Sequence, residues 1–139
     1  MVRVLHLADR LSTLGGADHY LLDLLAALRD AGVDQRVAAG RKDEALAIDG
    51  VTVSSCRLLG EAVARERGLE SLVAMFDWAD HIVCHNVMNP VALRAVAETG
   101  RGVVVVQDHR VFCPGRGKET ASGEVCRVAM SDEACAPCF

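Results

Sequence analysis

Residues 2–39 read VRVLHLADRLSTLGGADHYLLDLLAALRDAGVDQRVAA, and this stretch decides the fold class. Its opening, residues 2–7, is a short apolar run that predicts a β-strand. From Asp18 onward leucines recur at helical spacing, so we expect a helix with Asp18 as its N-cap and a stop at Gly32. Residues 33–39 return to a strand pattern. Strand, helix and strand in this order predict a parallel βαβ unit.

Outward from this unit, the alternation of strand and helix patterns continues toward the C-terminus. The four consecutive valines at 103–106 are typical of a strand that is covered on both faces. The whole pattern predicts an α/β fold with a Rossmann-like, doubly wound and mostly parallel sheet. Further strands are expected at 51–55, 81–85 and 103–106, helical segments within 61–78 with a break near Gly68, and a helix from Pro90 to Ala97.

Length and composition fit one globular domain followed by a short segment of different character. The chain has 139 residues, of which 51% are hydrophobic, and such a chain can form a core without disulfides. We expect the α/β domain to span residues 1–112 and a cysteine-rich loop to span 113–139. The formal net charge of −4 disfavours nucleic acid as a partner. Arg3 and Asp9 interrupt the apolar start, so we expect no secretory signal or membrane span there and a cytoplasmic protein.

The candidate site consists of polar residues that follow strands, because ligands of such sheets bind beyond the carboxyl ends of the strands. Gly15 and Gly16 precede the first helix, where backbone N–H groups can face a phosphate; a plain turn that needs a positive φ is the alternative. Histidines inside strands, His6 and His81, are expected to be structural. After the fourth and fifth strands come two polar clusters, His85-Asn86 and Gln107-Asp108-His109-Arg110.

Four cysteines lie close to the C-terminus: Cys113, Cys126, Cys135 and Cys138. The last two have the CxxC spacing that presents both sulfurs to one tetrahedral ion, so the set predicts a structural zinc site. Thiols in a mobile loop are one alternative. A redox-active dithiol at Cys135 and Cys138 is another, although only Phe139 follows and no helix is expected to activate the thiol.

These residues together resemble the N-terminal part of family 4 retaining glycosyltransferases of the GT-B fold. One part of the resemblance is the first strand, the loop that ends in Gly15-Gly16-Ala17-Asp18, and the helix that ends near Gly32. The other part is the stretch VVVVQDHRVFCP at 103–114, with Cys126 and the terminal Cys-Ala-Pro-Cys after it. The resemblance covers essentially the whole chain.

The resemblance implies an acceptor-side domain that works with a nucleotide sugar and a hydroxyl acceptor such as a saccharide or a lipid-linked glycan. Gly15 and Gly16 would line the cleft against the diphosphate of the donor. His85, Asn86 and Arg110 would face the acceptor. The family commonly has a histidine directly after the fifth strand, where this chain has Gln107 and then Asp108 and His109, so His109 or Gln107 would take the catalytic position.

The resemblance also implies what the chain lacks. The second, donor-binding domain of these enzymes is not in this sequence, so we expect a truncated half that is inactive alone. The chemistry needs no cofactor, and any zinc would be structural. A homodimer through the incomplete sheet and a peripheral membrane location are further expectations. The alternative function is a non-enzymatic, zinc-stabilised α/β module that binds an anionic ligand or a protein partner.

Overall fold

The computed structural model describes residues 1–107, 109, 113, 115, 117–120 and 122–138. The side chain of Cys138 lies outside this description. The chain divides into two compact units, Met1–Val105 and Val106–Phe139, and each is taken by itself below.

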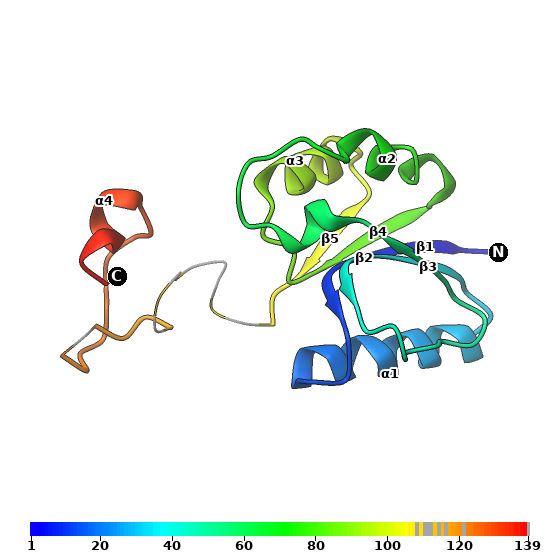
Figure 1. Ribbon diagram of the computed structural model, residues 1–139, viewed down its shortest axis with the longest axis horizontal. Helices are drawn as coiled ribbons and strands as arrows, with labels where there is room; N and C mark the ends of the chain where they lie inside the picture. The colour runs from blue at the N-terminus through cyan, green and yellow to red at the C-terminus, as the bar shows by residue number, and fades with distance from the viewer. Residues whose placement is uncertain (108, 110–112, 114, 116, 121, 139) are drawn as a thin grey trace. The chain divides into compact units, whose positions relative to one another are not determined.

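The first unit is built on a parallel sheet of five strands (Figure 1). The order is β3-β2-β1-β4-β5, and every neighbouring pair is parallel. This confirms the predicted α/β class and is compatible with a Rossmann-like fold. The strands are β1 (Arg3–Leu11), β2 (Asp34–Lys42), β3 (Thr52–Ser55), β4 (His81–His85) and β5 (Gly102–Val105).

Helices cover both faces of the sheet in Figure 1. Helix α1 (Gly16–Asp30) lies on one face, and α2 (Leu69–Val73) and α3 (Pro90–Glu98) lie on the other. Two short 3₁₀ turns, η1 (Arg57–Gly60) and η2 (Phe76–Trp78), accompany them in the connections between β3 and β4.

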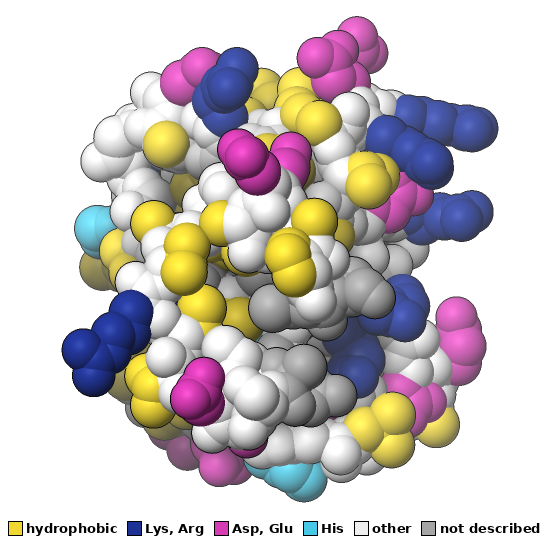
Figure 2. Space-filling model, turned by 90° about the vertical axis from the view of Figure 1, so that its left-hand side faces the viewer, with side chains coloured by type: hydrophobic (Ala, Val, Ile, Leu, Met, Phe, Trp, Pro, Cys, Tyr) yellow, Lys and Arg dark blue, Asp and Glu magenta, His cyan; other side chains and the backbone are white. Residues whose placement is uncertain are grey.

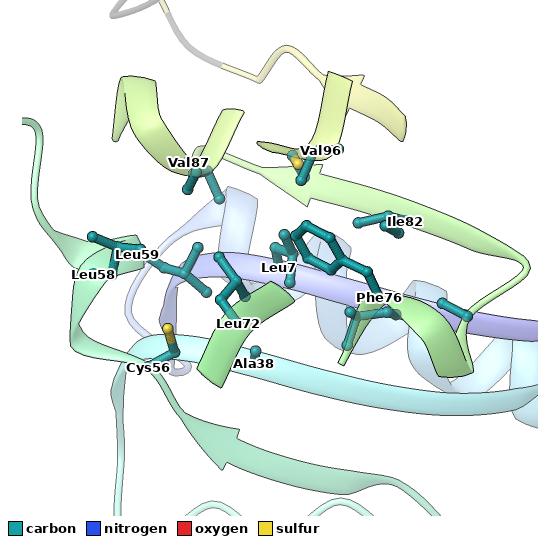
Figure 3. Packing of buried hydrophobic residues seen from close by; sticks show 14 residues of the cluster. Leu7, Ala38, Cys56, Leu58, Leu59, Leu72, Phe76, Ile82, Val87 and Val96 are labelled. Atoms are coloured by element: carbon teal, nitrogen blue, oxygen red, sulfur yellow. The ribbon is translucent and has the colours of Figure 1, made fainter. Parts of the chain in front are cut away.

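The core has two parts, one on each face of the sheet. On the face of α2 and α3, Leu72 and Phe76 pack with Leu7 and Ile82 of the sheet (Figure 3). On the face of α1, Leu21 and Leu25 pack with strand residues that include Val37. Strand β1 contributes to both parts of the core, with Leu5 and Leu7 on the face of α2 and α3 and Ala8 on the face of α1, as the two-residue period of a strand predicts.

The start of α1 differs from the prediction that Asp18 is the N-cap. Gly15 is the N-cap, and Asp18 lies inside the first turn. Its carboxylate accepts hydrogen bonds from Arg10 of β1 instead of capping the helix. The predicted stop is confirmed, because Gly32 follows the C-cap Ala31 with φ +77°.

Residues 61–68 contain no helix, although helical segments are predicted from residue 61. This loop is attached to the start of α3 by one buried side chain, Asn89. The Asn89 side-chain oxygen accepts hydrogen bonds from the N–H groups of Val91 and Ala92, and its amide group donates to the carbonyl of Val63 at 2.9 Å. Asn89 therefore caps α3 and fixes the loop at the same time.

The prediction that the valines of the last strand are covered on both faces is wrong. Val103 is 54% exposed and Val104 is 49% exposed. The reason is the position of β5 at the edge of the sheet, where β4 is its one neighbour among the described residues.

The elements described in the second unit are short. Residues Glu119 and Val125 form an isolated antiparallel bridge around a turn, and α4 (Asp132–Cys135) leads into η4 (Ala136–Cys138). The hydroxyl of Ser131 caps α4 by accepting from the N–H of Ala134 at 3.1 Å.

Candidate functional site

The strand order marks one place on the sheet where a ligand is expected. Going from β1, the chain first adds β2 and β3 on one side and later adds β4 and β5 on the other. Parallel α/β sheets bind ligands at this reversal, beyond the carboxyl ends of the two central strands. Here the central strands are β1 and β4. The loop 12–15, the start of α1 and the loop 86–89 lie at their carboxyl ends.

Gly15 and Gly16 form the start of α1, and neither is required there by the conformation of the chain. Gly15 is extended, with φ −151°, and neither glycine has a positive φ, so the alternative of a turn that needs a positive φ is wrong. A Cβ on Gly16 would meet nothing within 4 Å, and one on Gly15 would make only ordinary contacts. The space at Gly16 is open, and a helix N-terminus attracts anions to such a space.

Arg10 and Asp18 form an ion pair beside these glycines. The Arg10 Nη2 to Asp18 Oδ2 distance is 2.6 Å, and the guanidinium is partly exposed while the carboxylate is buried. Burial raises the pKa of Asp18, but the hydrogen bonds from Arg10 and Ser12 outweigh burial and leave this pKa below its usual value. Asp18 is therefore ionised, and Arg10 compensates its charge where an anion would otherwise be repelled.

A chain of buried hydrogen bonds runs under α1 and ends at the last residue of β4. The amide group of Gln35 donates to the carbonyl of Leu25 in α1 at 2.9 Å. The Gln35 side-chain oxygen is 3.2 Å from His6 Nε2, and His6 Nδ1 is 3.1 Å from His85 Nε2. Gln35, His6 and His85 are all at most 2% exposed. His85 Nδ1 has no hydrogen-bond partner among the described residues.

The direction of this chain fixes the protonation of both imidazoles. A carbonyl accepts only, so Gln35 must turn its NH₂ to Leu25 and its oxygen to His6. His6 Nε2 therefore carries the proton, and its bare Nδ1 accepts from His85 Nε2. It follows that His85 Nδ1 is an unprotonated nitrogen, buried and able to accept one hydrogen bond.

Both histidines are neutral near pH 7. Burial lowers the pKa of His6 to about 4, against the opposing hydrogen bond to Gln35. Burial, and then the charge that His6 would carry, lowers the pKa of His85 to about 4. A neutral imidazole with so low a pKa is a weak base at pH 7, so its chemical use is to accept a hydrogen bond.

Two further residues shape the surroundings of His85. The ring of Tyr20 lies 6.3 Å from the His85 ring and is partly exposed. Asn86, the next residue of the chain, has φ +54°, a left-handed conformation that asparagine tolerates better than most residues. His85 and Asn86 thus lie at the carboxyl end of the fourth strand, as the sequence pattern predicts.

The predicted residues after the fifth strand belong to the second unit. His109 Nε2 is 2.9 Å from the carbonyl oxygen of Gly115 and therefore donates to it. The side-chain oxygen of Gln107 is buried without a partner in the described part of the chain. Asp108 and Arg110 lie outside the described residues. The roles predicted for these four residues stay predictions.

The predicted zinc ligands are free thiols as far as they are described. Cys113, Cys126 and Cys135 are partly buried and form no disulfide. Hydrogen bonds from backbone N–H groups lower the pKa of the Cys113 thiol, and the largest of these effects comes from the N–H of Lys118. Within the described residues, no three His, Cys, Asp or Glu side chains are close enough to hold a metal together. These residues therefore do not show a zinc site, and the zinc remains a prediction.

Native mass spectrometry of the purified chain tests the zinc prediction. One zinc per chain, lost on denaturation, is expected if the four cysteines bind it, because structural zinc binding is coupled to folding. A Cys126→Ala variant should then bind no zinc, while a Cys56→Ala variant should keep it, since Cys56 is buried in the sheet core. A chain with no bound metal, in which these four cysteines are free thiols, would contradict the prediction.

Three residues of the candidate site were not singled out from the sequence: Arg10, Tyr20 and Gln35. His6 was expected to be structural, but its hydrogen bonds to Gln35 and His85 were not predicted. The sequence could have pointed to Tyr20, because it lies four residues after Gly16 and therefore on the same face of the predicted helix. Gln35 and His6 meet only through the pairing of β1 with β2 and β4. No local pattern in the sequence encodes that pairing.

Comparison with known proteins gives no relative: no protein-family model, no curated protein and no solved structure matches the chain. Over the described residues, no helix is both long and apolar enough to cross a membrane. Lys and Arg side chains and acidic side chains both occur on the face of the molecule shown in Figure 2.

Proposed function

We propose that this chain is the N-terminal, acceptor-side portion of a nucleotide-sugar-dependent retaining glycosyltransferase. The sugar would pass to a hydroxyl of an acceptor such as a saccharide or a lipid-linked glycan. The chain alone would be inactive, because the diphosphate leaving group needs a second domain with further donors. The single observation that carries the proposal is the buried Nδ1 of His85, which has no hydrogen-bond partner in the described part of the chain and lies at the reversal point of the sheet.

The proposed role of His85 is to orient the acceptor. In the transfer, the bond between the anomeric carbon and the phosphate oxygen breaks, a bond to the acceptor oxygen forms, and the hydroxyl proton leaves with the nucleoside diphosphate. A neutral Nδ1 accepts a hydrogen bond from that hydroxyl and holds its oxygen toward the anomeric carbon. Its pKa of about 4 makes His85 a positioning group and not the main proton acceptor.

The start of α1 would hold the diphosphate of the donor. Gly15 and Gly16 leave open space over the helix N-terminus, and the partly exposed guanidinium of Arg10 lies beside it. Because His85 is 2% exposed, the acceptor reaches Nδ1 only when a neighbouring side chain moves, and Tyr20 is the half-exposed neighbour that we propose to move.

Titration of the isolated chain, followed by NMR of ¹⁵N-labelled protein, tests this proposal. The donor probes are UDP-glucose, GDP-mannose and ADP-glucose, and the acceptor probes are methyl glycosides. We expect one donor to shift the amide signals at the start of α1, and an acceptor to move the His85 Nδ1 signal upfield, as a new hydrogen bond to a bare nitrogen does. His85→Gln should abolish the acceptor-induced shifts of the backbone amide signals around residue 85, which remain observable in this variant. His81→Gln, on the exposed start of β4, is the matched control and should leave both effects intact.

Shifts scattered over the sheet, or no shift at α1 and His85 with any probe at millimolar concentration, would overturn the proposal. A donor-induced shift that survives replacement of Gly15 and Gly16 by valine would place the diphosphate elsewhere, because two side chains would then fill the open space.

A further inference from the structure

The first unit contains a cavity that the proposed function does not use. It has a volume of about 390 Å³ and lies at the carboxyl end of β3, between η1, the loop 61–68 and α2. In the sheet order, β2 separates β3 from β1, so this cavity is not at the reversal point. Its size is within the range of about 300–1,000 Å³ that small-molecule sites occupy.

The lining of the cavity is strongly basic. Three arginines line it, Arg57, Arg65 and Arg67, against one acidic residue, Glu61, which gives a formal charge of +2. None of the three guanidinium groups has a carboxylate within ion-pair distance in the described part of the chain. Elsewhere in this unit, Arg3, Arg10 and Arg29 are each paired with an aspartate. Arg36, Arg94 and Arg101 of this unit also lack a carboxylate partner among the described residues, so the feature that marks the cavity is that three such arginines gather around it.

The rest of the lining is small, polar or apolar. Ser55 and Ser71 supply hydroxyl donors, and the buried Cys56 and Leu58, with Met75, supply apolar surface. Burial raises the pKa of Cys56, so its thiol stays protonated and brings no negative charge into the cavity.

The loop that carries Arg65 and Arg67 is held in place by the protein. Asn89 donates to the carbonyl of Val63 at 2.9 Å, and the N–H of Arg65 donates to the same carbonyl at 2.8 Å. At the other end of the loop, the N–H of Leu69 donates to the carbonyl of Glu66 at 2.8 Å. These hydrogen bonds hold the backbone of the loop on which Arg65 and Arg67 lie beside the cavity.

We propose that this cavity is a binding site for a small phosphate monoester. Such a ligand carries close to two negative charges at pH 7, which matches the formal charge of +2. Guanidinium groups bind phosphate oxygens in bidentate geometry, and the serine hydroxyls donate further hydrogen bonds. Phosphate alone would leave much of the volume empty, so the apolar surface at Cys56, Leu58 and Met75 receives the organic part of the ligand.

NMR titration of the ¹⁵N-labelled chain with three probes tests the site: phenyl phosphate, inorganic phosphate and phenol. Phenyl phosphate should shift amide signals at Cys56, Leu58, Gly68 and Ser71, and it should bind at least about fivefold more tightly than inorganic phosphate because its ring is buried against apolar surface. Phenol lacks the charge and should cause no saturable shift. Equal affinity for both phosphates would contradict a site for an organic monoester and leave an ion site only.

Matched triple variants separate this site from general attraction of anions. Arg57→Gln, Arg65→Gln and Arg67→Gln together should weaken phenyl phosphate binding at least about 30-fold, since the variant loses three positive charges and their charge-assisted hydrogen bonds to the phosphate. The control replaces the exposed Arg29, Arg94 and Arg127 by glutamine, with the same change in net charge, and should bind within twofold of the unchanged chain.

Equal weakening in both triple variants, or none in the first, would overturn the proposal. All three cavity arginines are exposed, so folding should persist; the single variants Arg65→Gln and Arg67→Gln serve if the triple variant unfolds. Because the titration reads only the cavity at β3, its outcome is independent of the nucleotide-sugar titration at α1 and His85.

Discussion

Lowering the pH from 6.5 to 4 is expected to reduce the free energy of unfolding by up to about 3 kcal/mol for each of the two buried histidines. His6 and His85 both have a pKa of about 4 in the folded chain, against 6.5 for an ordinary histidine. In this interval the unfolded chain takes up protons at both residues and the folded chain does not. Stability is therefore fully present above pH 6.5 and is lost as the pH falls toward 4.

Protonation of carboxylates lowers the stability of the fold only at a lower pH than protonation of the two histidines does. The hydrogen bonds from Arg3 lower the pKa of Asp80 to about 2, so this group contributes stability that is lost only below its ordinary value of 3.8. Acid destabilisation that begins near pH 6.5 thus belongs to the histidines.

Urea unfolding followed by Trp78 fluorescence, between pH 7.5 and 4.5, measures this effect. His85→Gln should be less stable at pH 7.5 but should depend less on pH, because one of the two titrating groups is gone. His81→Gln replaces a histidine on the exposed start of β4 and should follow the unchanged chain in parallel. A pH profile that is flat from 7 to 5 would show that the buried pair does not titrate as proposed.

Replacing Gly40 with alanine is expected to destabilise the fold by about 3 kcal/mol, at the upper end of the usual cost of overpacking. A Cβ on Gly40 would lie 2.2 Å from the backbone nitrogen of Gly60, 2.6 Å from its Cα and 2.7 Å from the carbonyl oxygen of Asp9. All three atoms belong to the backbone, so no side-chain rotation relieves the clash. Strand β2 and η1 would have to move apart, although Gly40 lies in the buried part of β2.

Gly60→Ala is the matched control for this prediction. Gly60 is the neighbour that a Cβ on Gly40 would strike, but a Cβ on Gly60 itself would lie 3.5 Å from its nearest atoms, which is an ordinary van der Waals contact. Its unfolding free energy should stay within about 0.5 kcal/mol of the unchanged chain. Thermal and urea unfolding of the two variants measure the difference directly, and equal stabilities would refute the assigned clash.

The sequence predicted the order of strands and helices well because their patterns are local. The first strand, the stop of α1 at Gly32 and the start of α3 at Pro90 all follow from residues within one or two turns. Asp18 was misassigned as an N-cap because Arg10, eight residues earlier, binds its carboxylate. A local preference for capping cannot include a partner on a neighbouring strand.

The candidate site was predicted only in part, for the same physical reason. Gly15, Gly16, His85 and Asn86 follow strands in the sequence and lie at the ends of the central strands in the structure. The buried contact of His6 with His85 depends on which residues of β1 and β4 stand opposite each other. This register is determined by the packing of both faces of the sheet, so no local sequence motif predicts it.

The pairing of β1 with β4 has a consequence for the way this chain folds. Partners on β1 and β2, such as Arg3 and Asp34, are close in the chain, whereas the hydrogen bond between Arg3 and Asp80 joins residues 77 apart and that between His6 and His85 joins residues 79 apart. Closing the longer loop carries the larger entropic cost, and contacts of this span slow folding. We therefore expect β1 to β3 to associate before β4 and β5 join them, and the contact between His6 and His85 to form at that later step.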